Sequence, residues 1–400
     1  MVHNFHAIAL GLFSALFPKL ATSVYTFSQM RNAPQPHPQS SVRPLIAGRA
    51  GAITTLLFAI CALAPLVIAP PQLAAAPQHA AAHAHHLLIY SIDVEGGQST
   101  LLVAPSGASL LVDTGWPDHN GRDADRIQAA MRDAGISKIN YLLITHYHTD
   151  HVGGVPNLVA RVPVGEFLDH GPNRENSAST RAGYAAYLKS IGGKPHRVVH
   201  PGDTIPIPGL NVIVLTADGK HISAIPGIQP KPNPYCATER KWPTDHTENA
   251  RSAGILVTYG KFRFLDMGDL TGAKEVALVC PDNPIPPIDL YLVTHHGMDL
   301  SNSRAIVDAI HPVVAIMNNG AHKGGKPVAW ETVHDSPGLK ALYMLHTAED
   351  SDAAHNSPEA FIANPKGDGD GHYFKVVASR NGGFSVTNTR TGQTREYARK

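Results

Sequence analysis

A short apolar segment of the chain ends in a dense cluster of metal-ligating side chains. Residues 141–145 (YLLIT) are expected to form a buried strand, and they run directly into HYHTDH at residues 146–151. Imidazole and carboxylate together suit zinc, manganese or iron. A solvated polar loop is the alternative, but the density of ligand types directly after an apolar strand favours a metal centre. The fold must therefore hold a metal at the end of a strand.

The four ligand-type side chains of this motif are expected to divide between two metal ions. His146 and His148 alternate in direction and can converge on one ion, whereas Asp150 and His151 turn away to serve a second. The chain holds 24 His and only 3 Cys among 400 residues. Since His is the commonest metal ligand, this excess supports a histidine-based site without locating it.

Composition limits the classes of function. Lys and Arg number 33 against 32 Asp and Glu, which gives a formal net charge of +1, and 43% of the residues are apolar. That apolar content excludes global disorder. The neutral balance argues against a protein that binds nucleic acid through bulk positive charge.

The N-terminal region is interpreted as a secretory leader. An apolar run over Ala50–Ala69 follows basic residues and precedes a small-residue segment, which is the pattern of a cleaved signal peptide. Cleavage is expected near Ala76, with Ala82 and Ala84 as alternatives. A membrane anchor is the competing interpretation, but Pro65 and the small-residue tail favour cleavage. Residues 1–85 are then a leader and linker without a stable membrane span after cleavage, and residues 86–400 form one periplasmic or secreted domain.

Cysteine usage agrees with export. Cys61 lies in the leader, so Cys236 and Cys280 remain as one pair in the mature chain. In an oxidising compartment the two would form a disulfide. Two free buried thiols are the alternative.

The rest of the chain reads as an α/β domain. Strands are expected at Leu87–Asp93, Ser99–Ala104, Ser109–Asp113, Tyr141–Thr145, Leu210–Thr216, Arg251–Tyr259, Phe262–Asp266, Asp289–Thr294, Val313–Met317, Tyr373–Ala378 and Phe384–Asn388, the last two as a closing hairpin. Helices are expected at Arg122–Ala134, Gly153–Val159, Ser177–Ile191 and Arg304–Ile310. Residues 220–249 form a long Pro-rich loop. Meanders and helices recur in two similar halves, which suits two mixed sheets packed face to face with helices outside.

The pattern HxHxDH after a strand resembles the signature of the metallo-β-lactamase fold. Three further motifs follow in order: DTG at residues 113–115, FLDMGD at 264–269 and VTHHG at 293–297. The resemblance implies a four-layer αββα sandwich over residues 87–390 and a metal-dependent hydrolase. It also implies that Asp113 supports the metal loop, that Asp269 bridges two metals, and that the last motif supplies a His ligand.

A narrower resemblance points to one branch of that family. The segments IDVEGGQ at residues 92–98, NARS at 249–252 and SNS at 301–303 are similar to the hydrolase domain of ComEC-type competence proteins. A role in DNA uptake does not follow from this resemblance.

The chain departs from the family pattern at the third histidine of the first metal site. That place holds Asn249, which is a weak ligand for zinc but tolerable for harder ions. His246 or His170 could contribute instead, so the first site is weak or only one metal is held tightly. His296 precedes Gly and is favoured as the ligand over His295, which then contacts the substrate.

These expectations combine into a hydrolase that uses a metal-activated water as its nucleophile. Asp150 would orient this water as well as ligate, with His295 as a second catalytic contact. The cofactor is expected to be one or two Zn²⁺ ions, with Mn²⁺ or Fe as alternatives. Phosphodiesters are the favoured substrates and nucleic acid is weakly supported; another ester, lactone or amide, or a non-catalytic metal-binding module, are the alternatives. Lys323 and Lys326 either meet a substrate phosphate or belong to a solvated basic loop.

Overall fold

The computed structural model describes residues 85–117, 119–367 and 369–398. All of them lie in the second of two compact units of the chain, Gln72–Lys400. The proposed leader, with its apolar run over Ala50–Ala69 and its cleavage near Ala76, falls outside the described residues. Within these ranges, no helix has both the length and the apolar character needed to cross a membrane.

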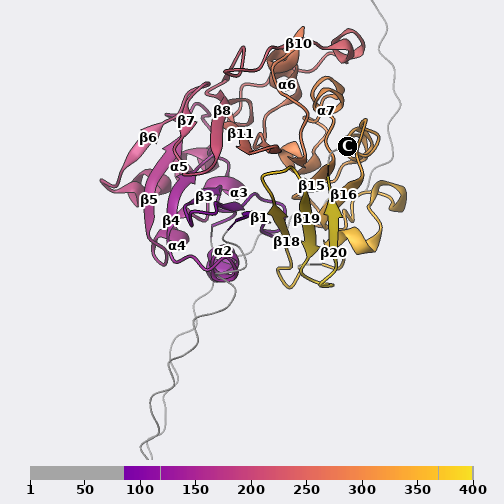
Figure 1. The fold of residues 1–400 in the computed structure, drawn as a ribbon. Coiled ribbons are helices and arrows are strands. Elements are labelled where there is room, and N and C mark those ends of the chain that lie inside the picture. The colour runs from indigo at the N-terminus through magenta and orange to yellow at the C-terminus, as the bar shows by residue number, and fades with distance from the viewer. Residues whose placement is uncertain (1–84, 118, 368, 399–400) are drawn as a thin grey trace, which may run out of the picture. The chain divides into compact units, whose positions relative to one another are not determined.

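The first of two large sheets joins the beginning and the end of this unit. Its strands, in spatial order, are β20 (Thr394–Tyr397), β19 (Phe384–Asn388), β18 (Phe374–Ala378), β1 (Leu87–Ser91), β2 (Thr100–Val103), β3 (Ser109–Val112), β4 (Ile139–Leu143), β5 (Val164–Asp169) and β6 (His196–Val198). Neighbours from β20 to β3 pair antiparallel, and neighbours from β3 to β6 pair parallel. In Figure 1 the yellow strand β18 accordingly lies beside the indigo strand β1.

The second large sheet repeats this change of direction. Its strands, in spatial order, are β17 (Ile362–Asn364), β16 (Ala341–His346), β15 (Val314–Met317), β14 (Leu290–Leu292), β12 (Phe262–Asp266), β11 (Gly254–Tyr259), β8 (Asn211–Ala217) and β7 (Thr204–Ile205), with β9 (Lys220–His221) also on β8. Pairs from β7 to β12 are antiparallel and pairs from β12 to β17 are parallel. A small sheet pairs β10 (Lys231–Pro232) with β13 (Asp282–Asn283).

Helices cover the outer face of each large sheet. They are α2 (Arg122–Asp133), α3 (Thr149–Val152), α4 (Val155–Val159), α5 (Ala178–Ile191), α6 (Gly272–Val279), α7 (Arg304–Ile310) and α8 (Pro327–His334). Residues of α2, α4 and α5 are buried in one cluster with the first sheet, and residues of α6, α7 and α8 in another with the second.

The strands are apolar on both faces because both faces are buried. In β1, Leu87 and Ile89 belong to the cluster between the two sheets, whereas Leu88 and Tyr90 belong to the cluster under the helices. Successive side chains of a strand point to opposite faces, so a strand between two layers needs a continuous apolar run. The predicted four-layer αββα sandwich of two mixed sheets is confirmed.

The helix expected at Gly153–Val159 is wrong at its start. The structure has two short helices, and the first, Thr149–Val152, begins inside the histidine motif. The motif is therefore part loop and part helix, not a loop throughout. A Cβ at Gly154 would lie 2.0 Å from the carbonyl oxygen of Thr114, so the two helices meet where the chain packs directly against another backbone.

The C-terminal hairpin is present, but it does not close the chain. Strand β20 adds to its edge through pairing with β19. Strands β6, β16 and β17 and helices α6 and α8 were not predicted. Strands β6 and β17 have only three residues each, whereas the buried apolar run of β16 was overlooked.

The Pro-rich segment 220–249 is irregular apart from β9, β10, the 3₁₀ turn Pro234–Thr238 and the first residue of a second 3₁₀ turn, Asn249–Arg251. A disulfide joins Cys236 of that turn to Cys280 at the end of α6, with a Cα–Cα distance of 5.9 Å. The expected pairing is therefore present, and it fastens the middle of the segment to the second helical layer.

Candidate metal centre

Four ligand-type side chains meet at the carboxyl ends of strands from both large sheets. Asp150 and His151 lie in α3, the short helix that follows β4. Asp269 follows β12, and His296 lies in the turn Thr294–Gly297 that follows β14, where His295 and His296 have φ values of +56° and +55°. Since the carboxyl ends of parallel strands meet at one edge of a sheet, the facing sheets bring these three segments together.

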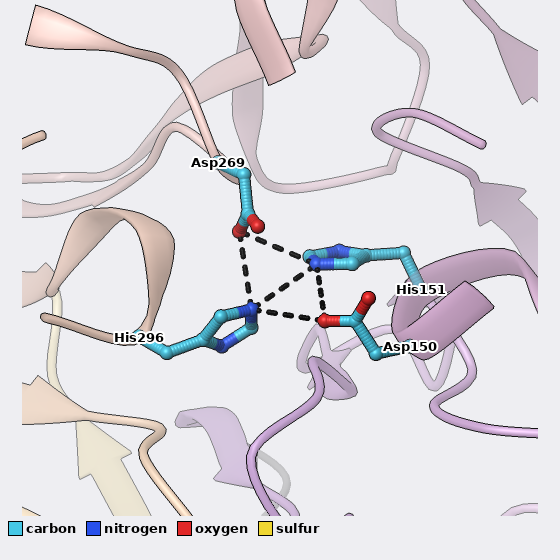
Figure 2. A group of neighbouring side chains, drawn as sticks. All are labelled: Asp150, His151, Asp269 and His296. Atoms are coloured by element: carbon cyan, nitrogen blue, oxygen red, sulfur yellow. Dashed lines mark hydrogen bonds and ion pairs between the residues drawn. The ribbon is translucent and has the colours of Figure 1, made fainter. Parts of the chain in front are cut away.

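The four residues form a compact group (Figure 2). Asp150 Oδ2 lies 3.2 Å from Nε2 of His151 and 3.2 Å from Nε2 of His296. Asp269 Oδ1 lies 3.3 Å from each of the same two nitrogens. One ligand atom from every residue lies within 4.8 Å of the others, and all four side chains are at most 9% exposed.

This donor set fits a divalent cation. Nε2 of His151 and Nε2 of His296 face each other at 3.2 Å, so that one cation could bind both nitrogens. Asp269 Oδ1 is buried without a hydrogen-bond donor among the described residues. A cation between these atoms would satisfy all of them, and two nitrogen and two oxygen donors suit zinc, manganese or iron.

Asp113 fixes the orientation of one imidazole in the group. Its Oδ2 accepts a hydrogen bond from Nδ1 of His151 at 2.7 Å, and its two oxygens also accept from the backbone N–H and the hydroxyl of Thr145. With Nδ1 protonated, the lone pair of Nε2 points into the group. The structure thus places Asp113 where the predicted supporting residue belongs.

Neighbouring positive charges keep the two carboxylates of the group ionised, which is the state that binds a metal ion. Burial alone raises the pKa of Asp150, but the Lys323 ammonium and the imidazole of His151 outweigh it and hold that pKa well below its usual range. Burial is likewise outweighed at Asp269, whose pKa is held low by His151 and His296.

The same carboxylates raise the pKa of His151. Burial lowers the pKa of His151, but Asp269, Asp150 and Asp113 raise it well above its usual value. The group therefore carries an excess of negative charge that attracts a cation, and a metal ion would take the place of that proton.

His146 lies beside the group but outside the set of four. Its Nε2 is 3.9 Å from Asp269 Oδ2 and has no hydrogen-bond partner among the described residues. Burial, with His151 and His148 nearby, holds the pKa of His146 well below its usual range. The neutral imidazole is thus available for a second cation that shares Asp269.

His148 is not brought into the group. Its Nε2 contacts Glu175 Oε2 at 2.9 Å, and the same oxygen accepts the backbone N–H of Glu248 at 3.0 Å. The expected convergence of His146 and His148 is limited to an edge-on ring contact, with centroids 4.7 Å apart.

His295 and Asn249 lie together at the edge of the group. Asn249 Nδ2 is 3.3 Å from Nε2 of His295, whose Nδ1 contacts Ser301 Oγ at 3.0 Å. Nε2 of His295 is also 3.4 Å from Asp269 Oδ2. Burial lowers the pKa of His295 to about 4, so its imidazole is neutral near pH 7. Of the two neighbouring histidines, the structure places His296 in the set of four.

The other candidates for the missing histidine lie elsewhere. His170 is buried against Glu248, with Nε2 and Oε2 2.8 Å apart, and His246 is exposed. Glu175 and Glu248 were missed by the sequence reasoning. Glu175 lies in a polar loop, and nothing in its surroundings marks it. Glu248 lies inside the Pro-rich segment, and only its position next to Asn249 could have drawn attention to it.

Comparison with known proteins finds one family model that matches part of the chain. Residues 93–231 match the family model described as the Metallo-beta-lactamase superfamily. A hydroxyacylglutathione hydrolase of Stenotrophomonas maltophilia is 33% identical over 104 residues, which are 26% of this chain and 37% of that protein. Recombination protein 2 of Haemophilus influenzae is 25% identical over 231 residues, which are 58% of this chain and 24% of that protein.

Among solved structures, the metallo-beta-lactamase fold protein YhfI from Bacillus subtilis aligns over 65% of this chain and 96% of its own, with 10% identity and a TM-score of 0.40. The chain spans little more than a third of the length of the hydroxyacylglutathione hydrolase and about a quarter of Recombination protein 2. Residues 93–231 are thus similar to the metallo-β-lactamase superfamily, and the two helix-covered sheets agree with the fold of that class of protein.

Proposed function

We propose that this protein is a secreted, metal-dependent hydrolase that cleaves phosphodiester bonds. The hydrolase part rests on one observation, the buried group of Asp150, His151, Asp269 and His296. These four residues would hold one divalent cation tightly, and His146 with Asp269 would contribute to a second, weaker site. A divalent cation in this position supplies a Lewis acid and lowers the pKa of coordinated water toward neutrality.

The surrounding residues have separate tasks in this proposal. Asp150 contacts both imidazoles through Oδ2, which leaves Oδ1 to accept a hydrogen bond from the attacking water and orient it. His295 is neutral and only 7% exposed at the edge of the group. It is placed to donate or accept a hydrogen bond to the substrate once the substrate displaces Asn249.

Two observations favour a phosphodiester. Lys323 brings an ammonium group to Asp150 at the edge of the site, and an anionic substrate gains from a positive charge there. The segments similar to the ComEC-type hydrolase domain are the second observation, and the alignment with Recombination protein 2 of Haemophilus influenzae over 58% of this chain is consistent with them. The near-neutral net charge does not favour long nucleic acid, so small phosphodiesters are the preferred substrates.

Cleavage of a carboxylic ester or thioester is the second candidate. A hydroxyacylglutathione hydrolase and an atrochrysone carboxyl ACP thioesterase of Pseudocercospora fijiensis, 31% identical over 107 residues, are among the relatives. The same activated water would attack a carbonyl carbon instead of phosphorus.

Hydrolysis assays on metal-analysed protein test the proposal. The purified protein is expected to contain about one tightly bound divalent cation per chain and to hydrolyse bis(p-nitrophenyl) phosphate with Mn²⁺ or Zn²⁺. Asp150→Ala should abolish turnover, and Asp282→Ala, at an exposed site, serves as the matched control. Turnover of thioesters but not of phosphodiesters would select the second candidate. Fewer than one bound metal with no turnover of any ester would refute both.

Export is tested separately. N-terminal sequencing of protein expressed from the full-length chain in a bacterium with a periplasm should find a new N-terminus near residue 77 in the periplasmic or secreted fraction. An intact N-terminus in the membrane fraction would support the anchor interpretation instead.

A further inference from the structure

Lys323 is a cationic side chain at the metal centre that the proposed ligand set does not use. It lies in the loop between β15 and α8, and its ammonium contacts Asp150 Oδ2. The ammonium also lies 5.0 Å from the ring centroid of Trp116. The side chain is 33% exposed, so it reaches from solvent toward the buried group.

The backbone holds this loop in a fixed position relative to His296. Gly325 N–H donates to the carbonyl oxygen of His296 at 2.9 Å, and Lys326 N–H donates to that of Gly297 at 2.8 Å. Within the loop, Gly320 N–H donates to the carbonyl oxygen of Lys323 at 2.9 Å. The segment that carries a proposed metal ligand therefore also carries the loop, and the position of Lys323 beside the centre is set by the fold.

Two glycines let the backbone of this loop pack closely against neighbouring segments. Gly324 has φ +76°, and a Cβ there would lie 2.0 Å from the carbonyl oxygen of His296. A Cβ at Gly96 would lie 2.9 Å from Gly320 N. The loop is thus packed against two neighbouring segments at positions where only glycine fits.

The ammonium is the charge of the centre that reaches solvent. Asp150 and Asp269 would balance one divalent cation, and the negative charge of Asp113, behind His151, would be matched by Lys323. The three carboxylates are at most 9% exposed, whereas the Lys323 side chain is 33% exposed and can meet an incoming anion. An ammonium has three N–H donors, and within the described ranges Asp150 is its only hydrogen-bond acceptor.

We propose that Lys323 binds an anionic phosphoryl oxygen of the substrate next to the scissile bond and thereby selects phosphodiesters over neutral esters. This inference rests on the proposed hydrolase function. Lys326, in the same glycine-rich loop, has a different role. It is the N-cap residue of α8, and its charge adds to the effect of His322 in lowering the pKa of Asp350. Of the two lysines, only Lys323 contacts a residue of the metal centre.

The test compares Lys323→Ala, Lys323→Arg and the matched control Lys326→Ala on two substrates. With bis(p-nitrophenyl) phosphate, an anion, Lys323→Ala should lower kcat/KM by about 30-fold, the usual effect of losing one charge-assisted hydrogen bond. Lys323→Arg should recover most of this loss, because the charge is kept. With p-nitrophenyl acetate, a neutral ester, Lys326→Ala should stay within about 3-fold of the wild type. Lys323→Ala should lose clearly less on this ester than on the anion, because only its contact with Asp150 is missed there.

Metal content of every variant, measured by mass spectrometry of the purified protein, should remain that of the wild type. Equal losses on the anionic and the neutral substrate, or an equal effect of Lys326→Ala, would overturn the inference. Failure of the wild type to hydrolyse any ester would instead overturn the proposed function. In that case, calorimetric titration of metal-loaded wild type and Lys323→Ala with inorganic phosphate still decides the inference, since binding lost only in the variant supports it and equal binding refutes it.

Discussion

At the scale of single residues, the metal centre depends on side chains that do not belong to it. Asp113 lies behind His151 and accepts its Nδ1–H, so the carboxylate decides which imidazole nitrogen faces the group. Asp113 has φ +59°, an uncommon conformation for a residue other than glycine. A residue held in such a conformation at the end of a strand indicates that its placement matters to the site.

Asp113→Asn should therefore weaken metal binding without removing a ligand. The loss of the negative charge lowers the basicity of His151 and frees its ring to rotate, and removal of such partners typically costs about 10–100-fold in metal affinity. Competition with a chromogenic chelator measures the affinity. Asp282→Asn, at an exposed site, is the control, and an unchanged affinity of Asp113→Asn would contradict the supporting role of Asp113.

At the scale of elements, loops rather than strands place the chemistry. The helix α3, the turn Thr294–Gly297 and the loop after β15 each leave the carboxyl end of a strand, and backbone hydrogen bonds join the turn to the loop. Glycines permit these contacts. Gly324 packs against the carbonyl of His296. Gly107 has a similar φ of +79°, but a Cβ at that position would have no atom within 4 Å.

Alanine substitutions at Gly107 and Gly324 distinguish the cost of backbone strain from the cost of a steric clash. Gly107→Ala should cost about 1 kcal/mol of unfolding free energy, the penalty for a side chain in the left-handed region. Gly324→Ala carries the same penalty and must also displace the segment of His296, so it should cost clearly more and reduce metal affinity. Chemical denaturation and chelator competition measure the two effects, and similar results for both variants would argue against a fixed loop.

The disulfide acts on the Pro-rich segment that borders the site. A cross-link between residues separated by 44 positions stabilises the folded chain by about 4 kcal/mol in the chain-entropy model. Reduction, or the double variant with Ser at Cys236 and Cys280, should lower the thermal midpoint accordingly. A midpoint that is insensitive to reductant in the wild type would mean that the bond does not constrain the unfolded chain.

At the scale of the whole folded unit, a buried charge cluster connects both sheets and a helix. Asp93 follows β1 of the first sheet, and its Oδ1 lies 2.8 Å from Nε2 of His346, the last residue of β16 in the second sheet. Arg126 of α2 donates to Asp93 Oδ2 at 3.0 Å and to Glu95 Oε1 at 2.9 Å. Three of the four layers thus share one network of charged groups.

Stability should depend on pH through this network. Burial lowers the pKa of His346, but the hydrogen bond and charge of Asp93 outweigh it, and the net shift is upward from 6.5. A raised folded-state pKa means that the stabilisation is fully present below pH 6.5 and is lost as the pH rises through the folded-state value.

His346→Gln should accordingly destabilise the protein by about 2 kcal/mol below pH 6.5, the typical contribution of a hydrogen bond to a charged group. The difference from wild type should shrink toward pH 9. Denaturant unfolding at several pH values measures both, and a difference that grows with pH would contradict a raised pKa of His346 in the folded state. His200→Gln, at an exposed site, is a suitable control.

The sequence by itself determined the class of fold and the chemical nature of the site. Strands such as β3 and β4 are buried on both faces, so they appear in the sequence as apolar runs. The ligand-type residues at 146–151, 269 and 296 can be identified from the sequence without knowledge of the fold. Short elements without such a run or a clear periodicity, among them β6 and α6, could not be found in this way.

Only the tertiary structure decided which ligand-type side chains meet. His148 turns to Glu175, and His170 turns to Glu248. Lys323, 173 positions from Asp150, contacts it because two sheets pack face to face. Spacing along a chain fixes only local directions, whereas a metal centre or an anion site depends on distances between distant segments, and packing of the whole unit sets those distances.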